Sequence, residues 1–259
     1  MRPTTGDETA THHPVPGRIL AWTRQRSDAP ELLDAQGHDP RELAANLRDI
    51  RLVNLLAGGS ATVLRHLSPL LAAIPEERPV TILDLATGSG DIPRAIMRWA
   101  ARHERAVTIT ASDASPEILA EARRLLRGTP GVAFAVWDAR AVPLPDRAFD
   151  IVLCSLALHH FIPDEACRIL GEMDRLARTG CIVNDIRRSA PGYIMAWGAS
   201  RVATRNRLTR HDMPLSVRRA YTPRELRALC RAAGIPDARV STHPLFRMAA
   251  VWRVPEHAR

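Results

Sequence analysis

The stretch that most constrains this chain runs from Val80 to Ile96 and reads VTILDLATGSGDIPRAI. Its first residues are mostly apolar or β-branched, which predicts a buried strand that carries Asp84 near its end. Glycines at 88 and 90 permit a tight turn and let a ligand approach the backbone. Apolar residues at helical spacing follow from Ile92. Because ligands of open α/β sheets bind beyond the carboxyl ends of strands, we expect a binding loop here.

Alternating strand and helix patterns continue along the chain. Further strands are expected at 106–111, 131–137, 149–154, 181–186, 238–242 and 246–253, with helices between most of them. The last two strands are expected to form a hairpin. This order predicts an α/β fold with a doubly wound, mostly parallel, seven-stranded sheet.

The chain divides into three parts. Residues 1–30 are rich in proline, threonine and charge, and are expected to form a disordered tail. Residues 31–78 carry apolar side chains at spacings of three and four, which predicts N-terminal helices that either cover the site or pack on the edge of the sheet. Residues 79–259 form the main domain, with a helical cap inserted at 187–221.

The net charge of +8 is concentrated in the cap. The segment holds eight arginines and one acid, Asp212. If the cap is helical, Arg201 and Arg205 share one face, and Tyr193, Met195, Trp197 and Val202 are candidates to face inward. The arginines could attract an acidic acceptor or carrier, touch anionic lipid, or form a solvated face.

Other sequence features indicate in which cellular compartment the protein resides. No apolar run is long enough for a transmembrane helix, and the first residues lack the apolar region of a secretory signal. The four cysteines contain no C-x-x-C pair and are expected to be buried thiols. We therefore expect a cytoplasmic protein.

The loop sequence resembles motif I of the class I methyltransferases that depend on S-adenosylmethionine (SAM). An acid at a strand end is followed by small residues and glycines, and DLATGSGD is similar to the loop of quinone-biosynthesis methyltransferases. Pro93 stands where a dinucleotide fingerprint would place its third glycine. The resemblance covers about residues 80–253 and implies a Rossmann-like methyltransferase fold with SAM as cofactor.

The resemblance also implies which residues contact the cofactor. An acid after the second strand can accept hydrogen bonds from both ribose hydroxyls, a role that falls to Asp113. Asp138 follows the third strand and resembles the acid that accepts from the adenine amino group. The expected cofactor residues are Asp84, Ala86, Thr87, Gly88, Gly90, Asp113, Ala114, Asp138, Ala139 and Ser155.

The loop after the fourth strand bears on the methyl acceptor. It reads CSLALHHF and lacks the Asn/Asp-Pro-Pro-Tyr motif of amine methylases. His159 and His160 are candidate bases, because an imidazole can take a phenol or enol proton near neutral pH, and His211 beside Asp212 is a third. Leu156 stands where metal-using relatives have a carboxylate, so no metal ligands are expected.

These features predict an enzyme of secondary metabolism that methylates a small hydroxylated, aromatic or polyketide-like molecule, with O-methylation favoured. C-methylation of a phenolic or quinone ring remains open, as does a scaffold that binds SAM without transferring methyl. Methylation of RNA is disfavoured because no separate RNA-binding domain is evident, so nucleic acid is not an expected partner.

Overall fold

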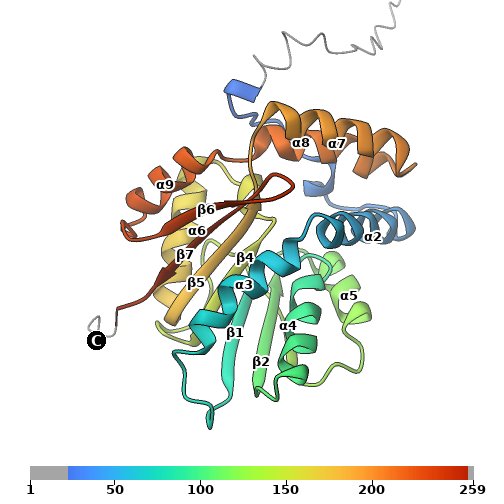
Figure 1. The fold of residues 1–259 in the computed structure, drawn as a ribbon. Helices are drawn as coiled ribbons and strands as arrows, with labels where there is room; N and C mark the ends of the chain where they lie inside the picture. Colours follow the sequence, from blue (N-terminus) through green and yellow to red (C-terminus); the bar gives the residue numbers. More distant parts are fainter. Residues whose placement is uncertain (1–22, 256–259) are drawn as a thin grey trace, which may run out of the picture.

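The computed structural model describes residues 23–255, in which one sheet of seven strands has the order β3-β2-β1-β4-β5-β7-β6 (Figure 1). The strands are β1 (Val80–Leu85), β2 (Val107–Asp113), β3 (Val132–Val136), β4 (Phe149–Ser155), β5 (Ala177–Ile186), β6 (Arg239–His243) and β7 (Arg247–Arg253). β7 pairs antiparallel with β5 and with β6, and the other neighbours are parallel. The predicted mostly parallel sheet with a terminal hairpin is confirmed.

Helices cover both faces of the sheet, which explains the apolar central strands. In β1, Ile82 packs with the helices of one face and Leu83 with those of the other, and both are fully buried. The first face carries α3 (Gly59–Leu71), α4 (Asp91–Arg102) and α5 (Pro116–Leu125), and the second carries α6 (Pro163–Leu176) and α9 (Pro223–Ala232) (Figure 1).

Two helix starts follow directly from local sequence. Ser115 caps α5 by accepting a hydrogen bond from the backbone N–H of Ile118, and Pro116 takes the first helical position. α9 begins with a capping box in which Thr222 and Glu225 satisfy each other's backbone N–H groups.

The remaining helices gather beyond the carboxyl ends of the strands. The short 3-10 helix η1 (Leu32–Asp34) and helix α2 (Pro40–Leu56) pack against α8 (Arg207–Arg219), which packs in turn against α7 (Ala190–Val202) (Figure 1). Helix η2 (Leu158–His160) follows β4 and also contacts α8. The segment expected to form the cap is therefore helical, and η1 and α2 pack beside it.

Three details of the sequence prediction are wrong. Arg205 lies in the connection after α7 ends at Val202, so it shares no helical face with Arg201. Val202 is 90% exposed rather than turned inward. β5 begins at residue 177 rather than at the expected residue 181, because α6 leads straight into it.

The tail prediction is wrong for residues 23–30. The Arg26 guanidinium donates to the backbone carbonyls of His159 and Phe161 at 2.8 and 2.7 Å, which ties this segment to the loop after β4. Residues 1–22 lie outside the described part of the chain. Within residues 23–255, no helix is both long enough and apolar enough to span a bilayer.

Candidate active site

The loop after β1 has an unusual backbone. Ala86, Gly88 and Gly90 all have positive φ angles, of 51°, 56° and 78°. A Cβ atom on Gly90 would lie 2.8 Å from Leu126 Cδ1, so this glycine is required for packing against α5. A Cβ on Gly88 would meet no atom within 4 Å, because this residue faces open space. Gly90 thus shapes the turn, and Gly88 leaves the backbone accessible.

Asp113 joins this loop to the one after β2. Its carboxylate accepts from the backbone N–H groups of Gly88 and Ser115, each at 3.0 Å. Burial raises the pKa of Asp113 despite these two donors. The two loops are therefore held together by one acidic side chain at the end of β2.

Asp84 lies beneath the same loop. One carboxylate oxygen accepts from the Thr87 hydroxyl at 2.6 Å, whereas the other, Oδ1, is buried without a hydrogen-bond partner. Burial, together with the nearby carboxylates of Asp91 and Asp113, raises the pKa of Asp84 to about 7. A ligand that donates a hydrogen bond could satisfy this oxygen.

These residues line a cavity of about 930 Å³ between the strand ends, η1 and α2. Nine of the ten predicted cofactor residues line it, namely Asp84, Ala86, Thr87, Gly88, Asp113, Ala114, Asp138, Ala139 and Ser155. Gly90 is the exception, since it packs against α5. Sequence reasoning missed Trp137, an aromatic lining residue directly before Asp138. Asp138 itself is held by Arg140, which also pairs with Glu165.

His159 is fixed by a buried carboxylate. Its ring Nδ1 lies 2.7 Å from Asp185 Oδ1, and its backbone N–H donates to Asp185 Oδ2 at 3.0 Å. Asp185 stands near the end of β5, and both residues are buried. The bond at Nδ1 orients the imidazole, and its Nε2 lies on the other side, toward Glu31.

His160 pairs with two acids. Its Nδ1 lies 2.8 Å from Asp34 Oδ1, and its Nε2 lies 3.9 Å from Glu31 Oε2. Burial opposes a charge on the ring, but the carboxylates of Glu31 and Asp34 outweigh it and raise the pKa of His160 to about 9. His160 is therefore positively charged at neutral pH.

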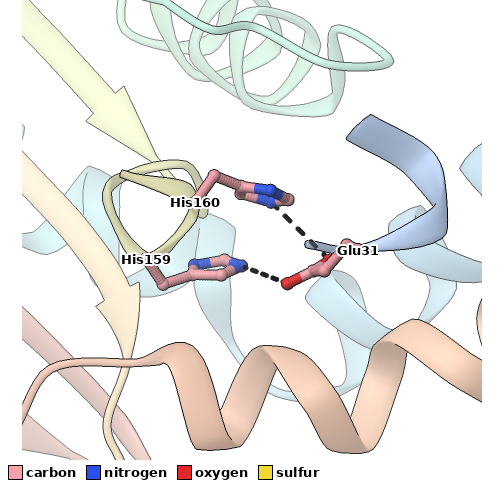
Figure 2. Close-up of side chains that lie close together, drawn as sticks. All are labelled: Glu31, His159 and His160. Carbon is pink, nitrogen blue, oxygen red and sulfur yellow. Dashed lines mark ion pairs between the residues drawn. The ribbon is translucent and has the colours of Figure 1, made fainter. Parts of the chain in front are cut away.

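Glu31 faces both histidines (Figure 2). It is only 4% exposed, and its Oε1 lies 3.8 Å from His159 Nε2. We call Glu31, His159 and His160 the histidine–glutamate cluster. One ligand atom of each lies within 4.8 Å of the others, so the cluster could hold a metal ion. Protonated His160 already balances the negative charge of Glu31. The absence of a metal from this cluster stays a prediction.

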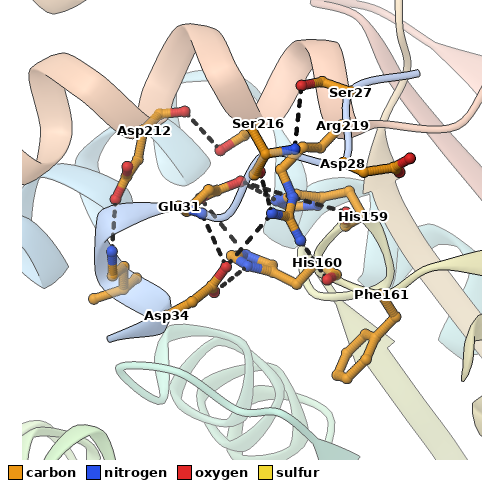
Figure 3. A network of polar contacts seen from close by, with 12 residues as sticks. Ser27, Asp28, Glu31, Asp34, His159, His160, Phe161, Asp212, Ser216 and Arg219 are labelled. Carbon is orange, nitrogen blue, oxygen red and sulfur yellow. Dashed lines mark hydrogen bonds and ion pairs between the residues drawn. The ribbon is translucent and has the colours of Figure 1, made fainter. Parts of the chain in front are cut away.

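Arg219 anchors the cluster from α8 (Figure 3). Its guanidinium donates to the backbone carbonyls of His159, His160 and Ala29, and lies 3.8 Å from Glu31 Oε1. This buried arginine thus acts with Arg26 in holding the loop after β4 against the segment before η1.

A second, smaller cavity of about 190 Å³ adjoins the first. It lies between α2, α7, α8 and the ends of β5 and β7, and its lining is largely apolar. Both cavities are lined by Leu33, Ile50, Leu156 and His160. Glu31 and His159 line the second cavity only, so the histidine–glutamate cluster stands at the junction.

Comparison with known proteins identifies the domain. A family model described as a methyltransferase domain matches residues 82–180. Residues 82–180 therefore form a methyltransferase domain.

Relatives of this methyltransferase domain include a demethylmenaquinone methyltransferase of Thermus thermophilus. It is 38% identical over 107 residues, which are 40% of this chain and 46% of that protein. The chain therefore spans less than half the length of this curated relative.

Two solved structures share the fold. A SAM-dependent methyltransferase from Aquifex aeolicus has 16% identity and a TM-score of 0.57, and the match covers 85% of this chain and 100% of that one. Human N-acetylserotonin methyltransferase, solved with SAM, has 18% identity and a TM-score of 0.61 over 92% of this chain and 66% of that one.

The first cavity has polar groups that suit SAM, the cofactor bound in the structure of human N-acetylserotonin methyltransferase. Asp113 supplies carboxylate oxygens of the kind that accept from ribose hydroxyls. The unpartnered Oδ1 of Asp84 can accept from a donor on the ligand, and Gly88 leaves room beside its backbone.

The third candidate base lies elsewhere. His211 projects from α8 with its side chain 48% exposed, and it is not among the residues that line either cavity. Its Nδ1 pairs with Asp212, whose oxygens also accept from the backbone N–H groups of Leu32 and Leu33. This pair therefore fixes η1 on α8, which gives it a structural role.

Several cap arginines are engaged within the chain. Arg188 is buried and pairs with Glu225 at 2.6 Å, Arg207 pairs with Glu42, and Arg219 holds the histidine–glutamate cluster. Arg201 donates to the carbonyl of Arg210. These internal contacts do not support a carrier-binding role for the arginine-rich cap.

Proposed function

We propose that this chain methylates a hydroxyl oxygen of a small aromatic or polyketide-like metabolite of secondary metabolism. The observation that carries the proposal is the second cavity, which is apolar and meets the cofactor cavity at Leu156 and His160. An acceptor held there would present its hydroxyl at the junction. Apolar walls suit a ring or acyl body and exclude water from it.

His159 is the group that takes the hydroxyl proton in this proposal. Its Nδ1 is bonded to Asp185, so Nε2 is the nitrogen that can accept. Glu31 lies 3.8 Å from Nε2 and would stabilise the imidazolium that forms. The sequence offered His159 as one of three candidates, and its contacts favour it over His160 and His211.

His160 has a different role. Because its pKa lies at about 9, its ring is already protonated at neutral pH and cannot serve as the base. Its positive charge would favour the anionic oxygen of a deprotonated acceptor. Bound SAM supplies an electrophilic methyl on a sulfonium, so the chain's remaining tasks are to align the oxygen and exclude water.

C-methylation of a phenolic or quinone ring is the second candidate. It is favoured by the 38% identical relative, which is named a demethylmenaquinone methyltransferase. Removing a phenol proton also makes the ring carbons nucleophilic, so the same base serves either reaction. The two reactions differ in which acceptor atom faces the methyl group.

The test is incubation of the purified chain with methyl-labelled SAM and a panel of phenols and hydroquinones. Mass spectrometry detects transfer, and NMR of the product locates the methyl on oxygen or carbon. We expect O-methyl product, and its loss in His159→Gln at unchanged SAM affinity. Binding of SAM with no transfer to any small molecule in the panel or in host extract would favour the scaffold. Label appearing in host RNA would favour RNA methylation.

A further inference from the structure

We propose that the acceptor carries a carboxylate or another anionic oxygen group, and that Arg247 binds it in the second cavity. The inference rests on the proposed function only in taking this cavity as the acceptor site. It narrows the substrate class to hydroxylated aromatic or polyketide-like acids.

Arg247 is a buried cation, and two of its three guanidinium nitrogens have no hydrogen-bond partner among residues 23–255. It opens β7, where it pairs with Ile186 of β5, and it is only 1% exposed. Its side chain lines the second cavity, and its Nε and Nη1 atoms are buried with no hydrogen-bond partner. Buried donors of this kind are costly unless a ligand satisfies them.

No nearby acid of the described chain neutralises Arg247. Within residues 23–255 no carboxylate forms an ion pair with it at 4.0 Å or less. Asp185 is engaged by His159 and the Ile186 N–H, and Asp91 by Asn54. Burial lowers the pKa of Arg247 to about 10, while Asp185 and Asp91 oppose that shift, so it stays charged at neutral pH.

Two other buried arginines, Arg188 and Arg219, have hydrogen-bond partners. Arg188 donates to the Ala220 carbonyl and to Glu225, each at 2.6 Å. Arg219, as described above, donates to three backbone carbonyls. Arg247 therefore differs in having two donors without partners, although it is at least as deeply buried as either.

The cavity gives the ligand its shape. Met195, Ala196, Met213, Val217 and Phe246 supply apolar walls. The charged lining groups include the cations Arg187 and Arg247 and the acids Glu31 and Asp212. Glu31 is paired with His159, His160 and Arg219, and Asp212 with His211 and the backbone of η1, which leaves Arg247 as the cation with two buried donors that lack partners. An acceptor that suits this lining has an apolar body, a hydroxyl directed at His159 and an anionic group at Arg247. A hydroxylated aromatic carboxylic acid has this combination, and the guanidinium would bind its carboxylate through charge-assisted hydrogen bonds.

The first test is equilibrium binding without turnover. Protein saturated with S-adenosylhomocysteine is titrated separately with 2,4-dihydroxybenzoate and with 2,4-dihydroxybenzamide. The amide has the same ring and hydroxyls as the acid but no charge. We expect the acid to bind about tenfold more tightly, and Arg247→Gln to remove that preference. Arg210→Gln, on the exposed face of α8, is the matched control and should keep it.

Equal binding of acid and amide by the wild type would overturn the proposal, as would a preference that survives in Arg247→Gln. Because no methyl is transferred, the outcome is independent of whether the chain proves to be an O-methyltransferase.

The second test is thermal unfolding without ligand. Removing an uncompensated buried charge should leave Arg247→Met at least as stable as the wild type. A large fall in melting temperature would show that Arg247 has a structural partner, and would overturn the proposal even if neither probe binds. Arg247→Lys, which keeps the charge, should retain part of the preference for the acid.

Discussion

Replacing Asp185 by asparagine tests the proposed role of His159 indirectly. Asp185 contacts His159 but is not among the residues that line either cavity. The carboxylate accepts from the backbone N–H and ring Nδ1 of His159, at 3.0 and 2.7 Å, and from the Ile186 N–H at 2.8 Å. An asparagine amide has only one acceptor oxygen. If its NH₂ group faces the ring, Nδ1 must accept, and the ring proton moves to Nε2. An imidazole in that tautomer cannot take the acceptor's proton.

The expected cost has two parts. Loss of general-base catalysis should lower kcat by about 10²-fold or more at saturating SAM. Loss of a charged hydrogen-bond acceptor should lower the free energy of unfolding by about 1.5–3 kcal/mol. The assay is a single-turnover measurement with labelled SAM and the acceptor found by the labelling experiment, alongside SAM binding by calorimetry, which should not change.

Asp174→Asn is the matched control. Asp174 accepts from Trp252 Nε1 at 2.9 Å and is not among the lining residues of either cavity, so its replacement should cost stability and leave kcat unchanged. Wild-type kcat in a folded Asp185→Asn variant would refute the assignment of His159 as the base.

Three further predictions concern cofactor, pH and metal. Asp113→Ala should weaken SAM binding by about 1–3 kcal/mol in calorimetry, and unchanged affinity in a folded variant would contradict its role. Although burial opposes it, hydrogen bonds from Arg78 and Thr81 hold the pKa of Asp150 below its usual value. The contribution of ionised Asp150 to the free energy of unfolding should therefore be complete above about pH 4 and be lost as the pH falls through its lowered pKa. In urea unfolding, Asp150→Asn should lower the free energy of unfolding by about 1.5–3 kcal/mol at pH 7 and by much less at low pH. An equal loss at both pH values would argue against this ion pair. Dialysis against a chelator should leave methyl transfer unchanged, because a protonated His160 balances the histidine–glutamate cluster. Activity lost on chelation and restored by a divalent cation would contradict that expectation.

The binding loop could be predicted because its constraints are local. The strand at 80–85, the glycine turn and the helix after it follow from neighbouring residues, and Asp113 follows one β-α-β unit later. Nearly all the residues expected around the cofactor line one cavity, because the carboxyl ends of parallel strands meet at one edge of a sheet.

Residues supplied from distant segments could not be predicted in the same way. Glu31 reaches the two histidines only because η1 packs on α8, and nothing near residue 31 in the sequence signals this. Asp185 lies near the end of a strand that was predicted. Its hydrogen bond to His159 depends on the loop after β4 folding back against β5. Arg247 did leave a weak signal, since it stands directly before the apolar run MAAVW in the strand RMAAVWR.

For the cap, the sequence prediction assigned too much to composition and too little to specific contacts. Its arginines were grouped as a charged surface on composition alone, whereas several of them make specific contacts inside the chain. Helical periodicity could not place Arg205, because the break after Val202 carries no proline or glycine.

The most direct test of the central claim is the position of the transferred methyl group. The purified chain is incubated with ¹³C-methyl SAM and a hydroxylated aromatic acid, and the product is examined by NMR and mass spectrometry, with His159→Gln in parallel. We predict a labelled methyl on the acceptor's hydroxyl oxygen in the wild type and little product in the variant. A label on ring carbon, or equal product from the variant, would contradict O-methylation with His159 as the base.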